Sequence, residues 1–580
     1  MRRFLKEKHH YFLLLAVFYY IILLVLLYSN RFESYIFYQR ISFDSSGAKI
    51  YANLYYPNKE VTFQDKAPLI IYAHGLGSQK DLDIRVPNEF TKRGFYVASI
   101  DYRGNGESTG HILDINYEFY RNRSIVPAIA QDCSKLLDVI ETLPIYKKIN
   151  STQIALIGHS LGGMVVLMNG ALDNRFTATV TWAGLVNFSA KEFDISETNP
   201  FMKYIPSKVI NSSNPSNLLV IQSIYDTTVP YKENALLAQK LTNCTVINIT
   251  EHLVGGPHFL LSDKVMIDTI RWVESKFFNS NVINGPIQLS YIYTSFLLIS
   301  GLIGLFLVTL GLIKYSLKFF SIELGVSKIN NPKLNEKFVD RKKRIILKEF
   351  IKIFLYFTGF ISTWIIFYLF LNILGIIIAP IIIISVYFCA ILLKYIIKAE
   401  KINQRIIAYI KLRLKDEIKS QFQKNVLLFS FFSIIIFLGL YISYSLIYPF
   451  AFFSPANFID FILTYSIYPF YLAIELFYRK IIYPRLYFIK SESNKTILTS
   501  FLAIINILIL MALSFQLFIF ESLLVTYLIF LAVIIMNSLI YEKTRKFSSV
   551  MISSFVIIQM FFGSAISTFL GIGSILNAFL

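Results

Sequence analysis

Hydrophobic residues follow two different patterns along this chain, and the pattern changes near residue 285. In residues 31–285, short apolar runs alternate with amphipathic stretches and with turns marked by Gly, Pro and Asn. The apolar runs PLIIYAHG, FYVASIDYRG, IALIGHS, ATVTWAG, LLVIQSIYD and VINIT are typical of strands, and helical patterns such as AIAQDCSKLLDVIETL lie between several of them. Strands that alternate with helices predict a mainly parallel sheet with helices on both faces.

Long apolar segments lie on both sides of this region. The first is an uncharged run of 19 residues from Tyr11 to Ser29, which is long enough to cross roughly 30 Å of hydrocarbon at about 1.5 Å per residue. A cleaved signal peptide is the alternative, but its apolar region usually has about 7–15 residues. The pattern therefore favours an uncleaved anchor in residues 1–30.

Residues 286–580 are predicted to form a polytopic helical domain with eight further spans. We place them near 289–313, 351–371, 374–397, 426–448, 458–477, 497–519, 522–541 and 549–571. A loop at LNIL is expected between the second and third of these spans, although this pair, around Pro380, could be divided differently. With the anchor, this makes an all-α transmembrane domain of about nine spans.

The distribution of charge supports this organisation. Residues 31–285 contain 24 basic and 24 acidic residues, so the net charge of +19 lies entirely among the apolar segments. This excludes a basic domain that binds nucleic acid. Loops rich in Lys and Arg alternate with loops that have neither, which predicts a cytoplasmic N-terminus and an extracytoplasmic position for residues 31–285 and for the C-terminus. The six Asn-x-Ser/Thr sequons within residues 31–285 are compatible with that side, although chance explains most of them equally well: Asn122, Asn150, Asn187, Asn211, Asn243 and Asn248.

The predicted spans carry few ionisable residues. Glu475, Asp460 and Glu521 are expected near span ends, where a charged side chain can reach the membrane interface. Small residues at 563–565, 571 and 573 predict close helix packing. We interpret this half as a scaffold, with lateral delivery of lipid to the other half as the alternative.

The sequence Gly158-His159-Ser160-Leu161-Gly162 lies between a predicted strand and a predicted helix. A turn this tight leaves no room for a Cβ atom at Gly158 or Gly162 and exposes the serine hydroxyl at the end of the strand. In this context Ser160 is predicted to be a nucleophile.

A serine nucleophile needs a base, and the base needs a carboxylate that orients it. His258, in the loop VGGPHF, is the favoured base, and His252 is the alternative. Asp226 ends a predicted strand and is the favoured acid, because the acid precedes the histidine in this arrangement. Asp194 and Glu192 are the alternatives.

An oxyanion hole needs backbone N–H groups that point to the developing negative charge. Leu161, which follows the nucleophile, is predicted to supply one N–H group. The sequence His74-Gly75-Leu76-Gly77 follows an early strand, and its glycines allow close approach of the backbone, so Leu76 is predicted to supply the other. His74 is expected to be structural, and the stretch DYRGNGES is expected to shape a loop.

The landmarks HGLG, DYRGNGES, GHSLGG, YDTTVP and GGPHF, in this order, resemble an α/β-hydrolase of the lipase/esterase and serine-peptidase type, over about residues 38–280. The resemblance implies an eight-stranded sheet and acyl transfer through an acyl-serine intermediate without a cofactor. A helical membrane domain of this size departs from the usual pattern of the family.

A small lid is expected at about residues 185–216, and its apolar side chains suit a lipid or acyl ester or else pack on the domain core. A serine peptidase or aminopeptidase, an acyltransferase, and a transporter or receptor with a ligand-binding domain remain as alternatives. No Cys/His cluster predicts a metal site; Cys133 and Cys244 are interpreted as buried thiols, with a disulfide as the alternative. The sequence leaves the oligomeric state open.

Overall fold

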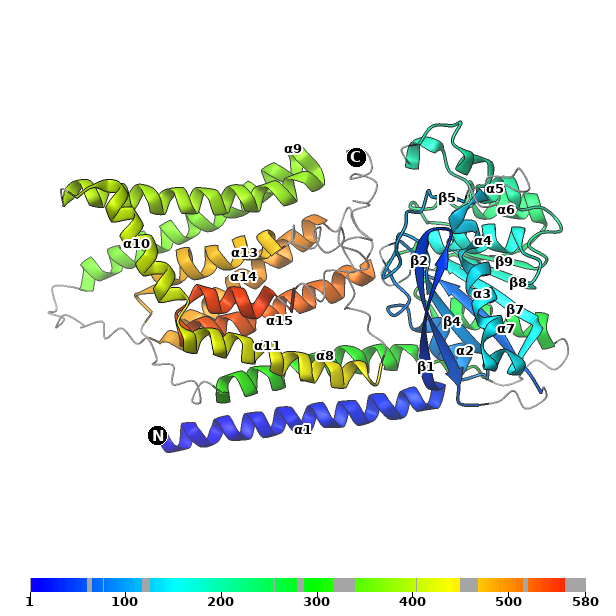
Figure 1. Ribbon diagram of the computed structural model, residues 1–580, viewed down its shortest axis with the longest axis horizontal. Helices are drawn as coiled ribbons and strands as arrows, with labels where there is room; N and C mark the ends of the chain where they lie inside the picture. The colour runs from blue at the N-terminus through cyan, green and yellow to red at the C-terminus, as the bar shows by residue number, and fades with distance from the viewer. Residues whose placement is uncertain are drawn as a thin grey trace.

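The computed structural model describes residues 2–59, 65–76, 78–116, 126–193, 195–251, 253, 256–278, 286–316, 339–402, 404–448, 468–489, 491–514, 520–555 and 557–558. An α/β domain lies at one end of the molecule and a group of long helices at the other (Figure 1). Helix α1 (Arg2–Ser34) continues directly into strand β1 (Tyr35–Ser45), so the helix extends slightly beyond the expected boundary at residue 30.

The α/β domain is built on an eight-stranded sheet with the strand order β1-β2-β4-β3-β7-β8-β9-β10. After β1 the strands are β2 (Ala48–Pro57), β3 (Ala67–Ala73), β4 (Tyr96–Asp101), β7 (Ile149–His159), β8 (Ala178–Trp182), β9 (Leu218–Ser223) and β10 (Thr245–Ile249). Strand β2 is antiparallel to β1 and β4, and all other neighbours are parallel. The predicted mainly parallel sheet is confirmed. A separate pair, β5 (Ile115–Asn116) and β6 (Val126–Pro127), is antiparallel.

Helices cover both faces of the sheet because successive strand residues are buried on opposite sides. In β3, Leu69 and Ile71 share one apolar cluster with residues of α3 (Asp132–Thr142) and α4 (Leu161–Leu172). Ile70 and Tyr72 share the other with α2 (Arg85–Thr91) and α7 (Asp263–Phe278). Helix α6 (Ala235–Thr242) packs with α4 in a third cluster.

The segment expected to be a lid contains two short 3₁₀ turns and helix α5 (Pro206–Val209). Phe188 contacts the rings of Phe193 and Phe201. Phe201 and Met202 are buried in the same cluster as α3 and α4. The apolar side chains of this segment therefore pack on the domain core, which is the second of the two roles the sequence left open.

The other half contains α8 (Tyr291–Ser316), α9 (Val339–Lys401), α10 (Ile406–Gln421), α11 (Lys424–Ser445), α13 (Tyr468–Leu476), α14 (Glu492–Ser514) and α15 (Phe520–Thr544). Within the described residues, five helical segments are long and apolar enough to cross a membrane: His10–Ser34, Tyr291–Ser316, Ile346–Phe367, Ile378–Lys401 and Lys424–Ser445. They coincide with the predicted anchor and the first four of the further spans.

The predicted number of nine spans is not confirmed. Helices α14 and α15 occupy the predicted spans at 497–519 and 522–541, whereas much of 458–477 and 549–571 lies outside the described residues. The LNIL stretch, which we expected to be a loop, belongs to helix α9. The apolar run continues through it without a charged residue or a proline, so nothing in the local sequence ends the helix there.

Helices α1 and α8 lie side by side along one edge of the molecule (Figure 1). Asn30 donates a hydrogen bond of 2.6 Å from Nδ2 to Thr294 Oγ1. A Cβ atom on Gly311 would lie 2.7 Å from the side chain of Leu13, so this glycine lets the two backbones approach closely. The small residues predicted to pack helices closely, Gly563, Ser564, Ala565, Gly571 and Gly573, lie outside the described residues.

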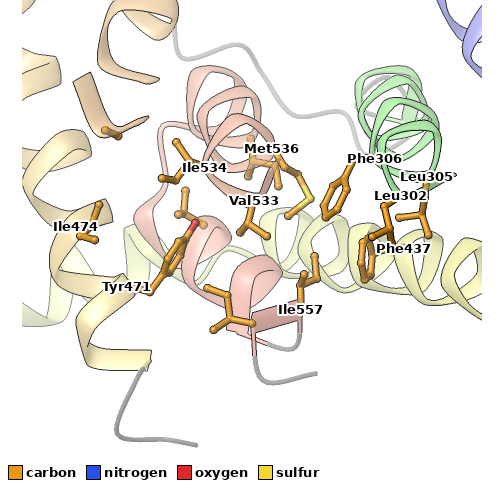
Figure 2. Close-up of a cluster of buried hydrophobic side chains, with 14 of the residues drawn as sticks. Leu302, Leu305, Phe306, Phe437, Tyr471, Ile474, Val533, Ile534, Met536 and Ile557 are labelled. Atoms are coloured by element: carbon orange, nitrogen blue, oxygen red, sulfur yellow. The ribbon is translucent and has the colours of Figure 1, made fainter. Parts of the chain in front are cut away.

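One hydrophobic cluster joins several of these helices. Figure 2 shows its centre, where side chains of α8, α11, α13 and α15 lie together, among them Leu305, Phe437, Ile474 and Val533. A single apolar core therefore holds helices that are far apart in the sequence.

The sequence predicted that the Glu475 side chain can reach the membrane interface, and the structure differs. The Glu475 side chain is buried, and its Oε2 atom accepts a hydrogen bond of 2.9 Å from Arg479 Nε. Tyr471 donates to the other oxygen at 3.0 Å, and Arg479 Nη2 donates to Ser538 Oγ at 2.5 Å. The carboxylate is stabilised inside the helix bundle because a guanidinium one helical turn away neutralises it.

We expect Arg479→Met to destabilise the protein by about 3–5 kcal/mol, because it leaves the Glu475 carboxylate buried without its cationic partner. The double variant Glu475→Gln/Arg479→Met should recover most of this loss. Thermal unfolding of the detergent-solubilised protein measures both, and Lys352→Met, which breaks an exposed ion pair with Glu349, is the control and should leave the midpoint unchanged. A double variant less stable than the single variant would contradict the prediction.

Candidate active site

Ser160 stands in a left-handed backbone conformation between β7 and α4, with φ of 54°. A Cβ atom on Gly158 would lie 2.3 Å from the carbonyl oxygen of Gly162. A Cβ atom on Gly162 would lie 2.2 Å from the carbonyl oxygen of Ala73. Both glycines of the predicted motif are thus required by close backbone approach, and the serine side chain is turned toward the carboxyl ends of the parallel strands.

The structure brings Ser160, His258 and Asp226 together in one hydrogen-bonded chain. His258 Nε2 lies 2.9 Å from Ser160 Oγ, and His258 Nδ1 lies 2.8 Å from Asp226 Oδ2. All three residues are buried. Because a carboxylate can only accept, Nδ1 carries the proton and Nε2 is free to accept the serine proton.

Asp226 is itself held in place from its other side. Its Oδ1 atom accepts backbone hydrogen bonds of 2.9 Å from Thr228 and 3.0 Å from Val229, in the turn that follows β9. The carboxylate therefore presents Oδ2 to the imidazole in a fixed orientation, which is the arrangement that makes a serine nucleophilic.

Of the alternative acids and base, only Glu192 is among the described residues, and its hydrogen bond is not to this chain. Glu192 is exposed in the lid segment, where it accepts a hydrogen bond from the Ser189 backbone. Asp194 and His252 lie outside the described residues.

The residues expected to form an oxyanion hole flank the serine. Leu161 is the first residue of α4, where backbone N–H groups have no carbonyl partner within the helix. Leu76 follows β3, and a Cβ atom on the neighbouring Gly75 would lie 2.7 Å from His159 Nδ1, so this loop runs close to the serine turn. Gly77, the other glycine of this motif, lies outside the described residues.

The stretch after β4 is organised around the buried carboxylate of Asp101. It accepts backbone hydrogen bonds of 2.6 Å from Lys80 and 3.0 Å from Glu107, and His74 Nε2 lies 3.2 Å away. Burial raises the pKa of Asp101, but the buried Lys80 ammonium and His74 outweigh burial and hold it well below its usual range. His74 and DYRGNGES thus lie in a buried network that shapes loops, as expected.

His159 is a residue whose contact the sequence did not predict. Its Nε2 atom lies 2.9 Å from the carbonyl oxygen of His258, so it supports the backbone of the loop that carries the base. The sequence motif offered little indication of this contact, because His159 occupies the variable position of Gly-x-Ser-x-Gly.

Among the described residues, no group of three or more His, Cys, Asp or Glu side chains could hold a metal ion. Cys133 and Cys244 are buried free thiols.

Part of this domain is similar to known hydrolases. Residues 64–253, which include Ser160 and Asp226, match the model of the serine aminopeptidase family S33. This match, together with the two relatives described next, supports the conclusion that the domain is an α/β-hydrolase enzyme.

Two curated relatives resemble parts of the chain. The quorum-quenching protein AidA of Acinetobacter baumannii (strain MDR-ZJ06) is 30% identical over 145 residues, which is 24% of this chain and 42% of AidA. Platelet-activating factor acetylhydrolase of Cavia porcellus is 24% identical over 217 residues, which is 32% of this chain and 48% of that enzyme. The chain thus spans less than half the length of both relatives.

A solved structure, the acylaminoacyl peptidase of Pyrococcus horikoshii, superimposes with a TM-score of 0.33 and 17% identity, over 42% of this chain and 41% of the peptidase.

We expect Gly162→Ala to lower the free energy of unfolding by at least about 3 kcal/mol, the upper end of the range for overpacking. The added Cβ atom would meet backbone that cannot move aside. Gly47→Ala is the control for steric overlap: Gly47 has a positive φ of 79°, which Gly162 does not, but nothing lies within 4 Å of its Cβ position. The free energy of unfolding of this control variant should fall by only about 1 kcal/mol, because of backbone strain. Urea denaturation of both variants tests this, and equal losses would contradict it.

Burial, with the neighbouring His258 as a smaller cause, lowers the pKa of His159 to about 3. An unfolded histidine has a pKa of about 6.5, so between these values the unfolded chain binds a proton that the folded chain does not. The free energy of unfolding should therefore fall as the pH falls, by up to about 1.4 kcal/mol per pH unit. His159→Gln should reduce this slope in urea denaturation at about pH 7 and about pH 5. An unchanged slope would show that His159 titrates normally.

Proposed function

We propose that residues 31–285 are a serine hydrolase that cleaves a carboxylic ester through an acyl-serine intermediate. The observation that carries this proposal is the hydrogen-bonded chain from Ser160 through His258 to Asp226. Its supporting features are the strained serine turn, the burial of all three side chains, and the match to a family of serine hydrolases.

In the proposed mechanism, Ser160 Oγ attacks the ester carbonyl carbon while His258 Nε2 takes the hydroxyl proton. The carbonyl oxygen becomes an oxyanion that accepts hydrogen bonds from the backbone N–H groups of Leu76 and Leu161. The bond to the alcohol oxygen then breaks, and His258 returns its proton to the leaving alcohol. Water repeats the sequence on the acyl-serine, with His258 again as base and then as acid, and Asp226 orients the imidazolium throughout.

A lipid or acyl ester is the favoured substrate class. A neighbouring helical half with segments apolar enough to cross a membrane supports it, as does the similarity to an acetylhydrolase. A serine peptidase is the second candidate, because the matching family model is described as a serine aminopeptidase. An acyltransferase would use the same residues and differ only in the acceptor.

We also propose that the protein spans the membrane with its hydrolase domain on the extracytoplasmic side and its N-terminus in the cytoplasm. The alternation of basic and uncharged loops along the helical half supports this orientation. The C-terminus would then be extracytoplasmic.

We expect wild-type protein in intact cells to react with a membrane-impermeant fluorophosphonate, and Ser160→Ala to lose this labelling at an equal expression level. Ser151→Ala, which changes an exposed serine at the start of β7, is the control and should label normally. Labelling only after cell lysis would overturn the orientation. No labelling under any condition would favour the transporter or receptor alternative.

Asp226→Asn should lower kcat by about 10⁴-fold, because it leaves the imidazole in the wrong tautomer. The measurement is hydrolysis of p-nitrophenyl esters by the detergent-solubilised enzyme, with aminoacyl p-nitroanilides as the comparison substrates. Faster cleavage of the anilides would favour the peptidase over the esterase.

A further inference from the structure

Helix α2 joins the α/β domain to the helical half through polar contacts. Asn88 Oδ1 accepts a hydrogen bond of 2.8 Å from the hydroxyl of Tyr448, just beyond α11. Glu89 Oε1 accepts backbone hydrogen bonds of 2.8 Å from Ser290 and 2.7 Å from Tyr291. We call these five residues the α2 junction.

Glu89 acts in this junction as a cap for another helix. Tyr291 opens α8, whose first N–H groups have no partner within the helix and carry the positive end of the helix dipole. The Glu89 carboxylate accepts from the N–H groups of Ser290 and Tyr291, so the start of a predicted membrane span is bound directly to α2. Ile84, immediately before α2, is buried in the hydrophobic cluster of the helical half.

The residues at the start of α2 also reach the candidate active site. Arg85 Nη1 donates a hydrogen bond of 3.1 Å to the carbonyl oxygen of Leu260, which lies two residues beyond His258. Asp83 holds the guanidinium by bonds of 3.0 Å to Nε and 2.8 Å to Nη2. The Arg85 guanidinium also lies 4.7 Å from the ring centroid of Trp182.

This ion pair is rigid. Asp83 and Arg85 are both buried, and Tyr72 donates a further hydrogen bond to Asp83. Burial alone would raise the pKa of Asp83, but the Arg85 guanidinium outweighs it and lowers that pKa to about 2. Arg85 therefore keeps a charged partner, and its orientation toward the loop is fixed.

The loop that carries His258 needs such support. Leu260 adopts a positive φ of 51°, a backbone conformation that is strained for a leucine. On the other side of this loop, Asp263 opens α7, and its Oδ1 atom accepts a hydrogen bond of 2.8 Å from the hydroxyl of Tyr291. The start of α8 thus contacts both α2 and α7.

We propose that Arg85 is a positioning residue for His258, and that the α2 junction makes this positioning depend on the helical half of the chain. Arg85 donates to the strained loop, and Asp83 fixes Arg85. The junction fixes α2 against the start of one predicted span and the end of another. The helical half is then part of the scaffold that aligns the base with the serine. A displacement of a reacting group by about 1 Å costs on the order of 100-fold in rate.

The proposal rests on the proposed hydrolase function, so wild-type activity is measured first. If the full-length wild-type protein neither hydrolyses p-nitrophenyl esters nor reacts with a fluorophosphonate, the proposed function fails. If it does both, the variants below test the positioning role by itself.

The first test is the double variant Asp83→Asn/Arg85→Gln, which removes both charges and leaves no unpaired ion in the interior. We expect kcat and the rate of fluorophosphonate labelling to fall by about 10- to 100-fold with KM unchanged, since substrate binding is untouched and only alignment is lost. Arg85→Lys should recover part of kcat, because an ammonium can still donate to Leu260.

The matched control is Arg93→Gln/Glu274→Gln. This pair also links the α2 region to α7, and the Glu274 carboxylate is buried, but neither residue contacts the His258 loop in the hydrogen bonds of the described residues. It should keep the wild-type kcat whatever it does to thermal stability. A wild-type kcat in Asp83→Asn/Arg85→Gln, or an equal fall in the control, overturns the positioning role.

The second test addresses the junction. Tyr291→Phe/Tyr448→Phe removes two hydroxyls that bind α7 and α2, and it should lower kcat several-fold at constant KM. Tyr444→Phe is its control, because that hydroxyl donates at 2.7 Å to Leu298 within the helical half. If the junction variant and its control both keep the wild-type kcat, the dependence on the helical half is overturned.

Discussion

The turn between β7 and α4 has no space for a Cβ atom at Gly158 or Gly162, and the arrangement of the candidate site depends on this constraint. The close approach of strand and helix forces Ser160 into a left-handed conformation. Its hydroxyl then stands at the edge where the parallel strands end, which is also where Asp226 follows β9 and the His258 loop follows β10. Loops from three strands can meet only at such an edge.

Buried ion pairs stabilise several of the loops around this edge. Lys80 contacts the carboxylates of Asp81, Asp101 and Glu107, and Asp83 contacts Arg85. Buried pairs of this kind contribute little net stability, because desolvation offsets most of the attraction. Their effect is on geometry, since each charge restricts its partners to one arrangement. The loops beside Ser160 are therefore defined by polar contacts, whereas the sheet behind them is held by apolar packing.

The sequence predicted what depends on local patterns. Alternating apolar runs located the strands, and glycine spacing with chain order located Ser160, Asp226 and His258. It did not predict the contact of Arg85 with Leu260, or that of Glu89 with the start of α8, because these partners are far apart in the chain and no periodicity links them. Glu475 was placed wrongly for a similar reason: the hydrophobic pattern put it near the end of a predicted span, but the neutralising network around Arg479 depends on how the helices pack.

The pairing of α1 with α8 has a consequence for assembly of the helical half. These two helices are neighbours in space, yet the whole α/β domain separates them in the chain. Closing an unstructured loop of roughly 250 residues costs about 5 kcal/mol in chain entropy. A folded α/β domain removes most of this cost, because β1 begins where α1 ends and Glu89 binds the residues at which α8 begins. The enzyme domain is thus also a connector, and its folding raises the effective concentration of one helix for the other.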